Sequence, residues 1–90
     1  MIFVTLGKLV PGKGKEFIEA LKSGNFDKPR LPEGVAALSA YVTYGQYDFV
    51  LTLEAKDLAA ANRALRELIT SGMLTTETLV GQTVREFVAQ

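Results

Sequence analysis

One stretch, residues 35–54, constrains the fold more than any other part of the sequence. Residues 35–44 and 47–54 are rich in β-branched, aromatic and small apolar side chains, as expected of β-strands. Gly45-Gln46 lies between them and suits a two-residue type II′ turn, which favours glycine at its first central position. The sequence therefore predicts an antiparallel hairpin.

The register of this hairpin follows from its turn. The expected pairs on one face are Tyr44–Tyr47, Val42–Phe49, Ala40–Leu51 and Leu38–Leu53. The expected pairs on the other face are Thr43–Asp48, Tyr41–Val50, Ser39–Thr52 and Ala37–Glu54. The first set is apolar throughout, and a shift of one residue would mix the two sets. Pattern and turn chemistry thus agree on one register.

Two amphipathic helices and two further strands flank the hairpin. Residues 1–6 predict a strand, residues 15–23 a helix ending near Gly24, and residues 24–34 an irregular connection. Asp57 is the expected N-cap of a helix that runs to about Thr70 and is followed by Gly72. The expected buried stripe of this helix is Leu58, Ala61, Leu65, Leu68 and Ile69.

The chain ends with a fourth strand and a short tail. Residues 74–80 are threonine-rich and β-branched, which predicts the strand. In the tail, residues 82–90, the side chains of Val84, Phe87 and Val88 indicate docking onto another surface. The order βαββαβ predicts a single α+β domain over residues 1–90 with the ferredoxin-like fold, a four-stranded antiparallel sheet with two helices on one face.

The sheet face away from the helices is expected to be neutral. Alternation assigns to the helix side Ile2, Val4, Leu6, Leu38, Ala40, Val42, Phe49, Leu51 and Leu53. It assigns to the other side Phe3, Thr5, Ser39, Tyr41, Thr43, Val50 and Thr52. A face this poor in charge favours burial in a homodimer, which would form a barrel from two sheets. The alternative is a solvated face that is rich in threonine because threonine favours strands.

Composition restricts the chemistry. Ten basic and ten acidic residues give a net charge of zero, so no nucleic-acid partner is expected. The 90 residues include neither cysteine nor histidine, so we expect no thiolate nucleophile, no transition-metal or haem site and no cofactor. No apolar run is long enough to span a bilayer, which predicts no membrane partner and a cytoplasmic location. Binding is therefore a better hypothesis than catalysis.

A few polar side chains are candidates for ligand contacts. Asp48 follows the hairpin turn and is suited to receive an ammonium group, although an aspartate there also serves to bind turn amides. Thr76 and Thr78 offer hydroxyl groups on the last strand, where threonine is also simply a good strand former. Glu77 between them is a candidate general base only if it is desolvated.

The stretch YVTYGQYDFVLTLE (residues 41–54), followed by Asp57-Leu58 and by Thr-Glu-Thr-Leu at residues 76–79, resembles a known family. It is similar to the effector-binding (RAM) domain of the leucine-responsive regulator/AsnC family of transcription factors. The related GYD-type domains share the glycine–x–Tyr–Asp turn. The likeness covers about half of the chain, and the remaining elements fit in order.

The resemblance implies a dimeric α/β barrel that assembles further into tetramers or octamers. It implies that small effectors, commonly amino acids, bind near the turn and the last strand. Carried over, the ligand-binding residues are Gly45, Tyr47 and Asp48 of the turn and Thr76 and Thr78 of the last strand. Gln46 occupies the variable position.

The chain also departs from these regulators. Its first strand begins at Met1, where they carry a DNA-binding helix-turn-helix. Its 24–34 connection is longer than theirs, and its 82–90 tail is extra. The leading hypothesis is a stand-alone, homo-oligomeric domain that binds a small molecule, such as an amino acid, without catalysis. One alternative is a small cofactor-independent enzyme of the monooxygenase or isomerase type, using Asp48 or Glu77. Another is a partner that associates with full-length regulators.

Overall fold

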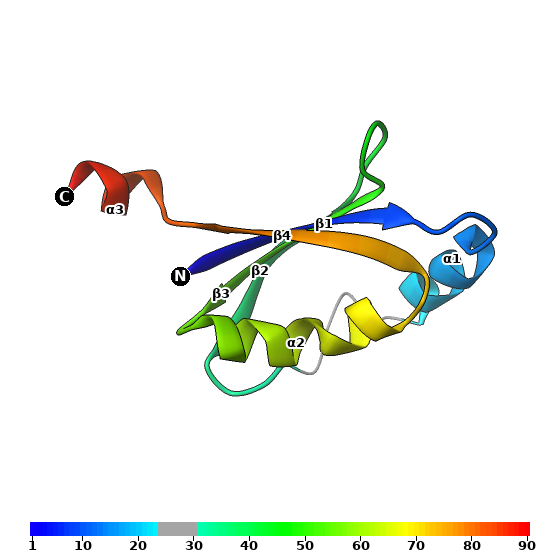
Figure 1. Cartoon of the computed structure of the whole chain (residues 1–90), viewed down its shortest axis with the longest axis horizontal. Helices are drawn as coiled ribbons and strands as arrows, with labels where there is room; N and C mark the ends of the chain where they lie inside the picture. The colour runs from blue at the N-terminus through cyan, green and yellow to red at the C-terminus, as the bar shows by residue number, and fades with distance from the viewer. Residues whose placement is uncertain (24–30) are drawn as a thin grey trace.

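The chain forms one antiparallel sheet with its two longer helices on the same side (Figure 1). The structure, a computed structural model, describes residues 1–23 and 31–90. The strand order is β2-β3-β1-β4, so β2 and β4 are the edge strands. The elements are β1 (Ile2–Leu9), α1 (Gly14–Lys22), β2 (Val35–Val42), β3 (Phe49–Ala55), α2 (Leu58–Thr70), β4 (Leu74–Gly81) and α3 (Val84–Val88). This is the ferredoxin-like fold that the sequence predicts.

The helix α2 begins and ends at the expected residues. The carboxylate of Asp57 accepts a hydrogen bond from the Ala60 N–H at 2.8 Å, which satisfies a donor of the first turn. Gly72 follows the last turn with φ of +77°, the left-handed conformation that glycine adopts most readily. The expected end of α1 at Gly24 lies outside the described residues.

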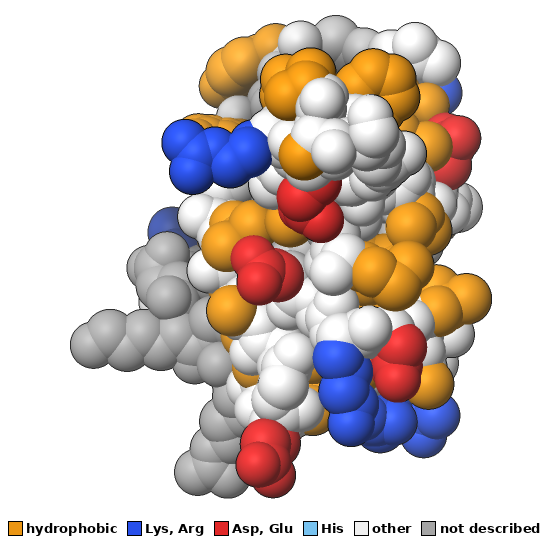
Figure 2. Space-filling model, turned by 90° about the vertical axis from the view of Figure 1, so that its left-hand side faces the viewer, with side chains coloured by type: hydrophobic (Ala, Val, Ile, Leu, Met, Phe, Trp, Pro, Cys, Tyr) orange, Lys and Arg blue, Asp and Glu red, His pale blue; other side chains and the backbone are white. Residues whose placement is uncertain are grey.

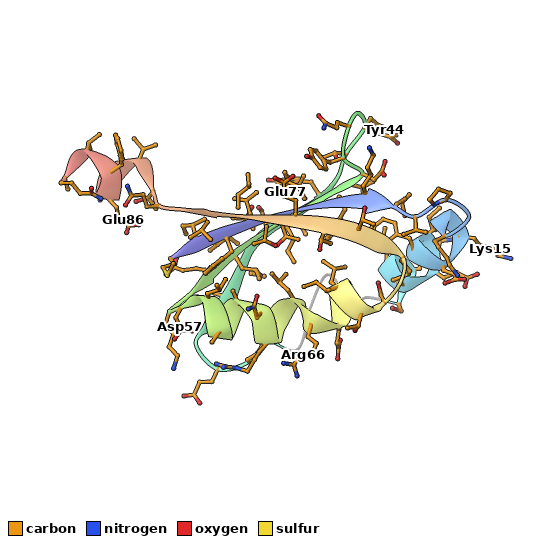
Figure 3. The ribbon with its side chains drawn as sticks, viewed as in Figure 1. Lys15, Tyr44, Asp57, Arg66, Glu77 and Glu86 are labelled. Carbon is orange, nitrogen blue, oxygen red and sulfur yellow. The ribbon has the colours of Figure 1, made fainter. Side chains whose placement is uncertain are left out.

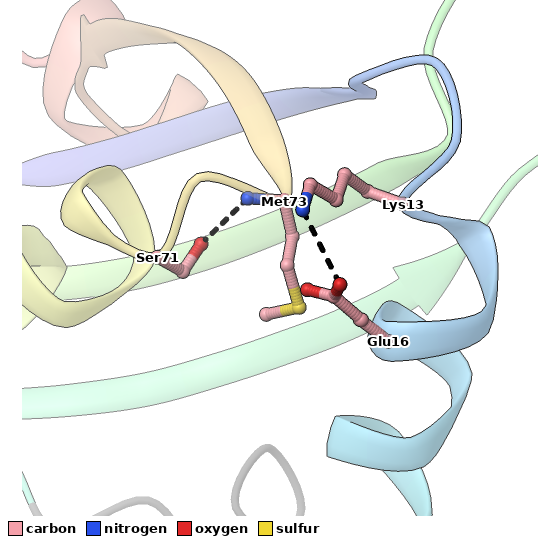
Figure 4. Close-up of polar contacts among 4 residues, drawn as sticks. All are labelled: Lys13, Glu16, Ser71 and Met73. Atoms are coloured by element: carbon pink, nitrogen blue, oxygen red, sulfur yellow. Dashed lines mark hydrogen bonds and ion pairs between the residues drawn. The ribbon is translucent and has the colours of Figure 1, made fainter.

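A polar contact between residues close in sequence lies at the start of α1, and another lies just before β4 (Figure 4). The ammonium of Lys13 pairs with the Glu16 carboxylate one helical turn later at 3.3 Å. Ser71 accepts a hydrogen bond from the Met73 N–H at 3.2 Å. The Met73 carbonyl in turn accepts the N–H of Val10 at 2.9 Å, which joins the end of β1 to the connection before β4.

The core lies between the sheet and the helices. Its buried members are Phe3, Phe17, Phe49, Leu53, Ala55, Ala60, Ala61, Leu65, Leu68 and Leu74. Phe17 of α1 meets Phe49 of β3 edge-to-face, with ring centroids 5.6 Å apart. Leu58 and Ile69 were expected in this core but are 52% and 48% exposed. They lie in the first and last turns of α2, at the two ends of the helix.

The faces of β1 are the reverse of the expected ones. Phe3 and Thr5 are fully buried on the helix side, where they pair with Leu53 and Leu51 of β3. The residues that alternate with them, Ile2, Val4 and Leu6, therefore face the other side of the sheet. Alternation separates the two sets of side chains, but it does not say which set faces the helices.

Gly7 explains why Phe3 and Thr5 lie on the helix side. It continues β1 beyond the expected end of the strand and pairs with Phe49. A Cβ atom at Gly7 would lie 3.2 Å from Leu74 Cδ1 and 3.4 Å from Phe49 Cβ. The core therefore has room for backbone only at this point, and glycine takes the helix side together with Phe3 and Thr5.

The β2–β3 register is confirmed next to the hairpin and wrong farther from it. Residues 39–42 pair with residues 49–52 as expected. A bulge then shifts the register by one residue, so Ala37 pairs with Leu53 and Leu38 is left 52% exposed. The expected Leu38–Leu53 and Ala37–Glu54 pairs are therefore wrong.

The turn of the hairpin is wider than the sequence predicts. Residues 44–47 form a loop, and the hydrogen bond from the Thr43 N–H to the Asp48 carbonyl closes it at 2.9 Å. Gly45 has φ of +133°, a conformation that residues with a Cβ rarely adopt. We refer to residues 44–47 as the hairpin loop.

The side of the sheet away from the helices is called the open face below. Its members, as the strand pairs place them, are Ile2, Val4, Leu6, Lys8, Ala36, Ser39, Tyr41, Val50, Thr52, Glu54, Thr75, Glu77 and Leu79. The expectation for residues 39, 41, 50 and 52 is confirmed, and that for Phe3 and Thr5 is wrong. Aliphatic side chains of β1 and β4 replace them in the middle of the open face, and the charged side chains of Lys8, Glu54 and Glu77 lie on the same face.

Candidate functional site

The hairpin loop and the middle of β4 meet on the open face. The Tyr47 hydroxyl donates a hydrogen bond to the Glu77 carboxylate at 3.0 Å, across thirty residues of sequence. Glu77 and the fully exposed Tyr44 both lie on the side of the sheet opposite α2, and the loop rises beyond the sheet there (Figure 3). This contact joins the two halves of the sequence pattern that predicted a ligand site.

The contact with Glu77 also changes the acidity of Tyr47. The hydrogen bond to the carboxylate, and then its negative charge, raise the pKa of the Tyr47 phenol above its ordinary value. The phenol therefore stays protonated and remains a donor over a wider pH range. The Thr43 hydroxyl donates to the Tyr47 carbonyl at 2.7 Å and holds the backbone of the loop in place.

Asp48 is bound to the backbone of β1. Its carboxylate Oδ2 accepts the Leu9 N–H at 2.8 Å, and its own N–H donates to the Gly7 carbonyl at 2.8 Å. These two bonds fix the end of the hairpin against β1. The sequence offered two roles for Asp48, contact with a ligand and binding of backbone amides. One oxygen of its carboxylate has the second role.

Thr76 and Thr78 lie on the opposite side of the sheet from Glu77. They pair with Gly7 and Thr5, whose side of the sheet faces the helices. The hydroxyl groups of Thr78 and Thr5 lie 2.9 Å apart and share a hydrogen bond. Thr5 is fully buried, so this bond satisfies a hydroxyl group inside the core.

The structure therefore brings some of the predicted site residues together and separates others. Gly45 and Tyr47 belong to the hairpin loop, Tyr47 contacts Glu77 of the open face, and Asp48 follows directly. The two threonines lie on the helix side of the edge strand β4. The sequence named Glu77 only as a candidate general base, and its contact with Tyr47 was not predicted, although strand alternation places it opposite to its two threonine neighbours.

A hollow lies on the helix side of the sheet, away from the hairpin loop. It has a volume of about 170 Å³ and lies between α2 and β3 on the helix side, lined by apolar residues such as Leu51, Leu65 and Met73.

Within residues 1–23 and 31–90, no three acidic, histidine or cysteine side chains gather as metal ligands. No helix in the same described ranges is both long and apolar enough to cross a bilayer.

The comparison with known protein families identifies the pattern around the hairpin loop. The GYD domain family matches residues 30–89, which include the hairpin and β4. The chain belongs to the GYD domain family. This confirms the GYD part of the resemblance seen in the sequence.

One curated relative of this GYD domain is named for its partners. The "glutamine synthetase and cystathionine beta-lyase binding protein" of Thermus thermophilus is 37% identical over 57 residues. The match covers 63% of this chain and 60% of the relative. The chain thus matches less than two thirds of that protein's length.

Solved structures share the fold of this GYD domain. A crystal structure named FFRP-DM1 matches with a TM-score of 0.59 and 24% identity, covering 90% of this chain and 97% of that one. The hypothetical protein PHS023 from Pyrococcus horikoshii has a TM-score of 0.52 and 24% identity, with coverage of 91% and 93%. LrpC of B. subtilis has a TM-score of 0.52 and 12% identity, covering 91% of this chain and 51% of LrpC. At these identities the likeness is one of fold.

Proposed function

We propose that this GYD domain is a small regulatory binding domain that acts as a homodimer and binds a small molecule of the amino-acid class. The observation that carries the proposal is the apolar open face, together with the polar hairpin loop at its margin. The domain pairs with a second copy through the open face. The ligand binds beside the hairpin loop and affects how the two copies assemble.

The open face supports pairing because it leaves apolar side chains exposed. Tyr41 is 62% and Leu79 46% exposed, and Val4, which pairs with Leu79, is only half-buried. Covering such surface gains about 25 cal/mol per Å² of apolar area. A net charge of zero gives little electrostatic repulsion between copies.

The hairpin loop supports binding of a ligand that carries an amino group. The exposed Glu77 carboxylate beside the Tyr47 phenol is suited to accept charge-assisted hydrogen bonds from an ammonium group. Gly45 lacks a side chain and allows the ligand close to the backbone, and Asp48 adds a second negative charge. Because β4 is an edge strand, a ligand that reaches around it meets the hydroxyl group of Thr76, whereas the hydroxyl group of Thr78 already bonds to Thr5.

A protein partner is the second candidate ligand. It is favoured by the name of the Thermus thermophilus relative, which states binding to glutamine synthetase and cystathionine beta-lyase. In this alternative the exposed hairpin loop contacts an enzyme surface. A pull-down with these two purified enzymes distinguishes it from binding of a free amino acid.

Thermal unfolding in the presence of each of the twenty amino acids tests the ligand. We expect at least one to raise the melting temperature, and Glu77→Gln to weaken its binding about tenfold or more, because it removes the charge from the carboxylate. Glu19→Gln, an exposed acidic residue on α1, is the matched control and should leave binding unchanged. Equal loss in both variants, or no response to any amino acid, contradicts the amino-acid proposal.

Light scattering after size-exclusion chromatography tests the dimer. Val4→Lys places a charge in the middle of the open face and should yield monomers at concentrations where the unchanged chain is dimeric. Ile69→Lys places the same charge on α2, on the helix side, and should not change the mass. A monomeric unchanged chain at about 100 μM, well above typical dimer dissociation constants, would overturn the dimer.

A further inference from the structure

The helix α3 ends the chain as an arm that extends away from the body of the domain. Figure 1 shows it beyond the end of the sheet, at the opposite end of the molecule from α1. No residue of α3 is buried. Figure 2 faces this end of the molecule and shows hydrophobic side chains on its surface.

The arm has an apolar face without a partner among the described residues. Val84, Phe87 and Val88 are 79%, 65% and 69% exposed. They are spaced i, i+3 and i+4, so they lie on one side of the helix. A soluble chain rarely leaves three large apolar side chains of one helix in water, and such a face marks an interaction surface.

Hydrogen bonds hold both ends of α3, although its apolar face is exposed. The Thr83 hydroxyl accepts the Glu86 N–H at 3.0 Å, and the Glu86 carboxylate accepts the Thr83 N–H at 3.3 Å, a complete capping box. Gln90 reaches back to Gln82 with a 2.9 Å hydrogen bond. A helix of five residues has little stability of its own in water, because nucleation is costly. It therefore needs a packing partner for its apolar face.

We propose that α3 packs on the second copy of this chain and extends the dimer interface beyond the sheet. This inference rests on the homodimer proposed above. Only Gln82 and Thr83 separate α3 from β4, and Leu79 near the end of β4 belongs to the open face. The arm is thus continuous with the surface that pairs the two copies.

The size of the open face favours a second copy as the partner of the arm. Four strands of seven or eight residues cover on the order of 500 Å² in projection, and the accessible surface of such a face is larger because side chains stand up from it. A standard interface buries about 800 Å² of accessible surface on each partner, so the sheet supplies a large part of such an interface. A buried phenylalanine contributes about 150–250 Å², so Phe87 and its two valine neighbours enlarge it substantially.

A single tryptophan provides the direct test, because the chain has none. In Phe87→Trp we expect blue-shifted emission where the dimer is populated and a red shift on dilution, with the same midpoint as dissociation measured by light scattering. Ile69→Trp on α2 is the control, and its emission should not change with dilution. The shift in Phe87→Trp alone shows that the arm is covered by the second copy.

The other outcomes overturn the inference in distinguishable ways. Blue-shifted emission that persists after the dimer has dissociated places the arm on its own chain. Red-shifted emission in an intact dimer leaves the proposed dimer standing and overturns the arm contact. A chain that is monomeric at every concentration overturns the dimer and the arm together.

Alanine variants give a second readout that does not depend on tryptophan. Phe87→Ala should raise the dimer dissociation constant at least tenfold, as truncation of a buried aromatic anchor does at interfaces. Arg85→Ala, on the other side of the same helix, should change it less than about threefold. Equal dissociation constants for the two variants contradict the proposal.

Discussion

Gly7 controls the packing of β1 at the scale of a single residue. Its hydrogen atom occupies the place where a methyl group would press on Leu74 and Phe49. At Gly14, the first residue of α1, the corresponding position has no neighbour within 4 Å apart from the adjacent residues and the backbone of the helix itself. The two glycines therefore offer a matched pair of substitutions.

We expect Gly7→Ala to lower the free energy of unfolding by about 1–2 kcal/mol, because the added methyl group overpacks the core. Gly14→Ala should leave it unchanged or raise it by up to about 1 kcal/mol, since alanine favours the helix and loses less entropy on folding. Urea unfolding of both variants measures the difference. Equal effects would show that the packing around Gly7 can adapt.

The Tyr47–Glu77 hydrogen bond predicts a dependence on pH. Because the folded pKa of Tyr47 is raised above its ordinary value of 10.0, its contribution to stability is complete below that pH and is lost as the pH rises through the folded pKa. The stability advantage of the unchanged chain over Tyr47→Phe should therefore shrink at alkaline pH. Unfolding free energies of both chains from about pH 8 to 12 test this.

Glu77→Gln is the control for this titration. It removes the negative charge that opposes the phenolate, so the pKa of Tyr47 measured by ultraviolet absorbance should fall towards its ordinary value. An unchanged tyrosine titration in Glu77→Gln would show that the side chains of Tyr47 and Glu77 are not in contact in solution.

At the scale of the element, α3 depends on its capping box. The hydrogen bonds from Thr83 lower the pKa of Glu86 below its ordinary value of 4.5. The contribution of this carboxylate is therefore present above pH 4.5 and is lost as the pH falls through the lower folded pKa. We expect α3 to lose helical structure in that acidic range before the sheet does.

Amide chemical shifts of residues 84–88 measure this loss, and those of β3 report on the sheet. Glu86→Gln keeps the side-chain acceptor without the titrating charge, so its α3 should be insensitive to the same change in pH. If α3 and β3 respond together in the unchanged chain, the capping box does not control the helix.

The elements show where sequence reasoning succeeds and where it stops. The cap at Asp57 and the end at Gly72 depend on neighbouring residues alone, and both were predictable. The bulge beside Leu38 and the wide hairpin loop depend on how two strands settle against the core. No local pattern encodes them.

At the scale of the whole molecule, the order of elements was enough to predict the fold. The facing of β1 was not predictable, because Phe3 and Ile2 are equally apolar and the close packing of Gly7 against Leu74 and Phe49 decides between them. The same holds for the candidate site. Gly45 and Tyr47 follow from the turn pattern, whereas the partnership of Tyr47 with Glu77 depends on the packing of β4 beside β1.

An apolar dimer interface predicts little dependence on salt. The dimer dissociation constant should rise less than about threefold between 50 mM and 500 mM NaCl, because screening acts on charges and not on apolar contacts. Analytical ultracentrifugation at the two concentrations measures it. A tenfold rise would indicate that ion pairs hold the two copies together.

The bulge beside Leu38 has a consequence for aggregation. It interrupts the row of unpaired N–H and C=O groups on the outer edge of β2, so a strand of another molecule cannot pair with β2 along its whole length. β4 forms the other border and keeps a regular course from Leu74 to Gly81. If heat or crowding causes these molecules to form fibrils, we expect new strands to add to the exposed edge of β4.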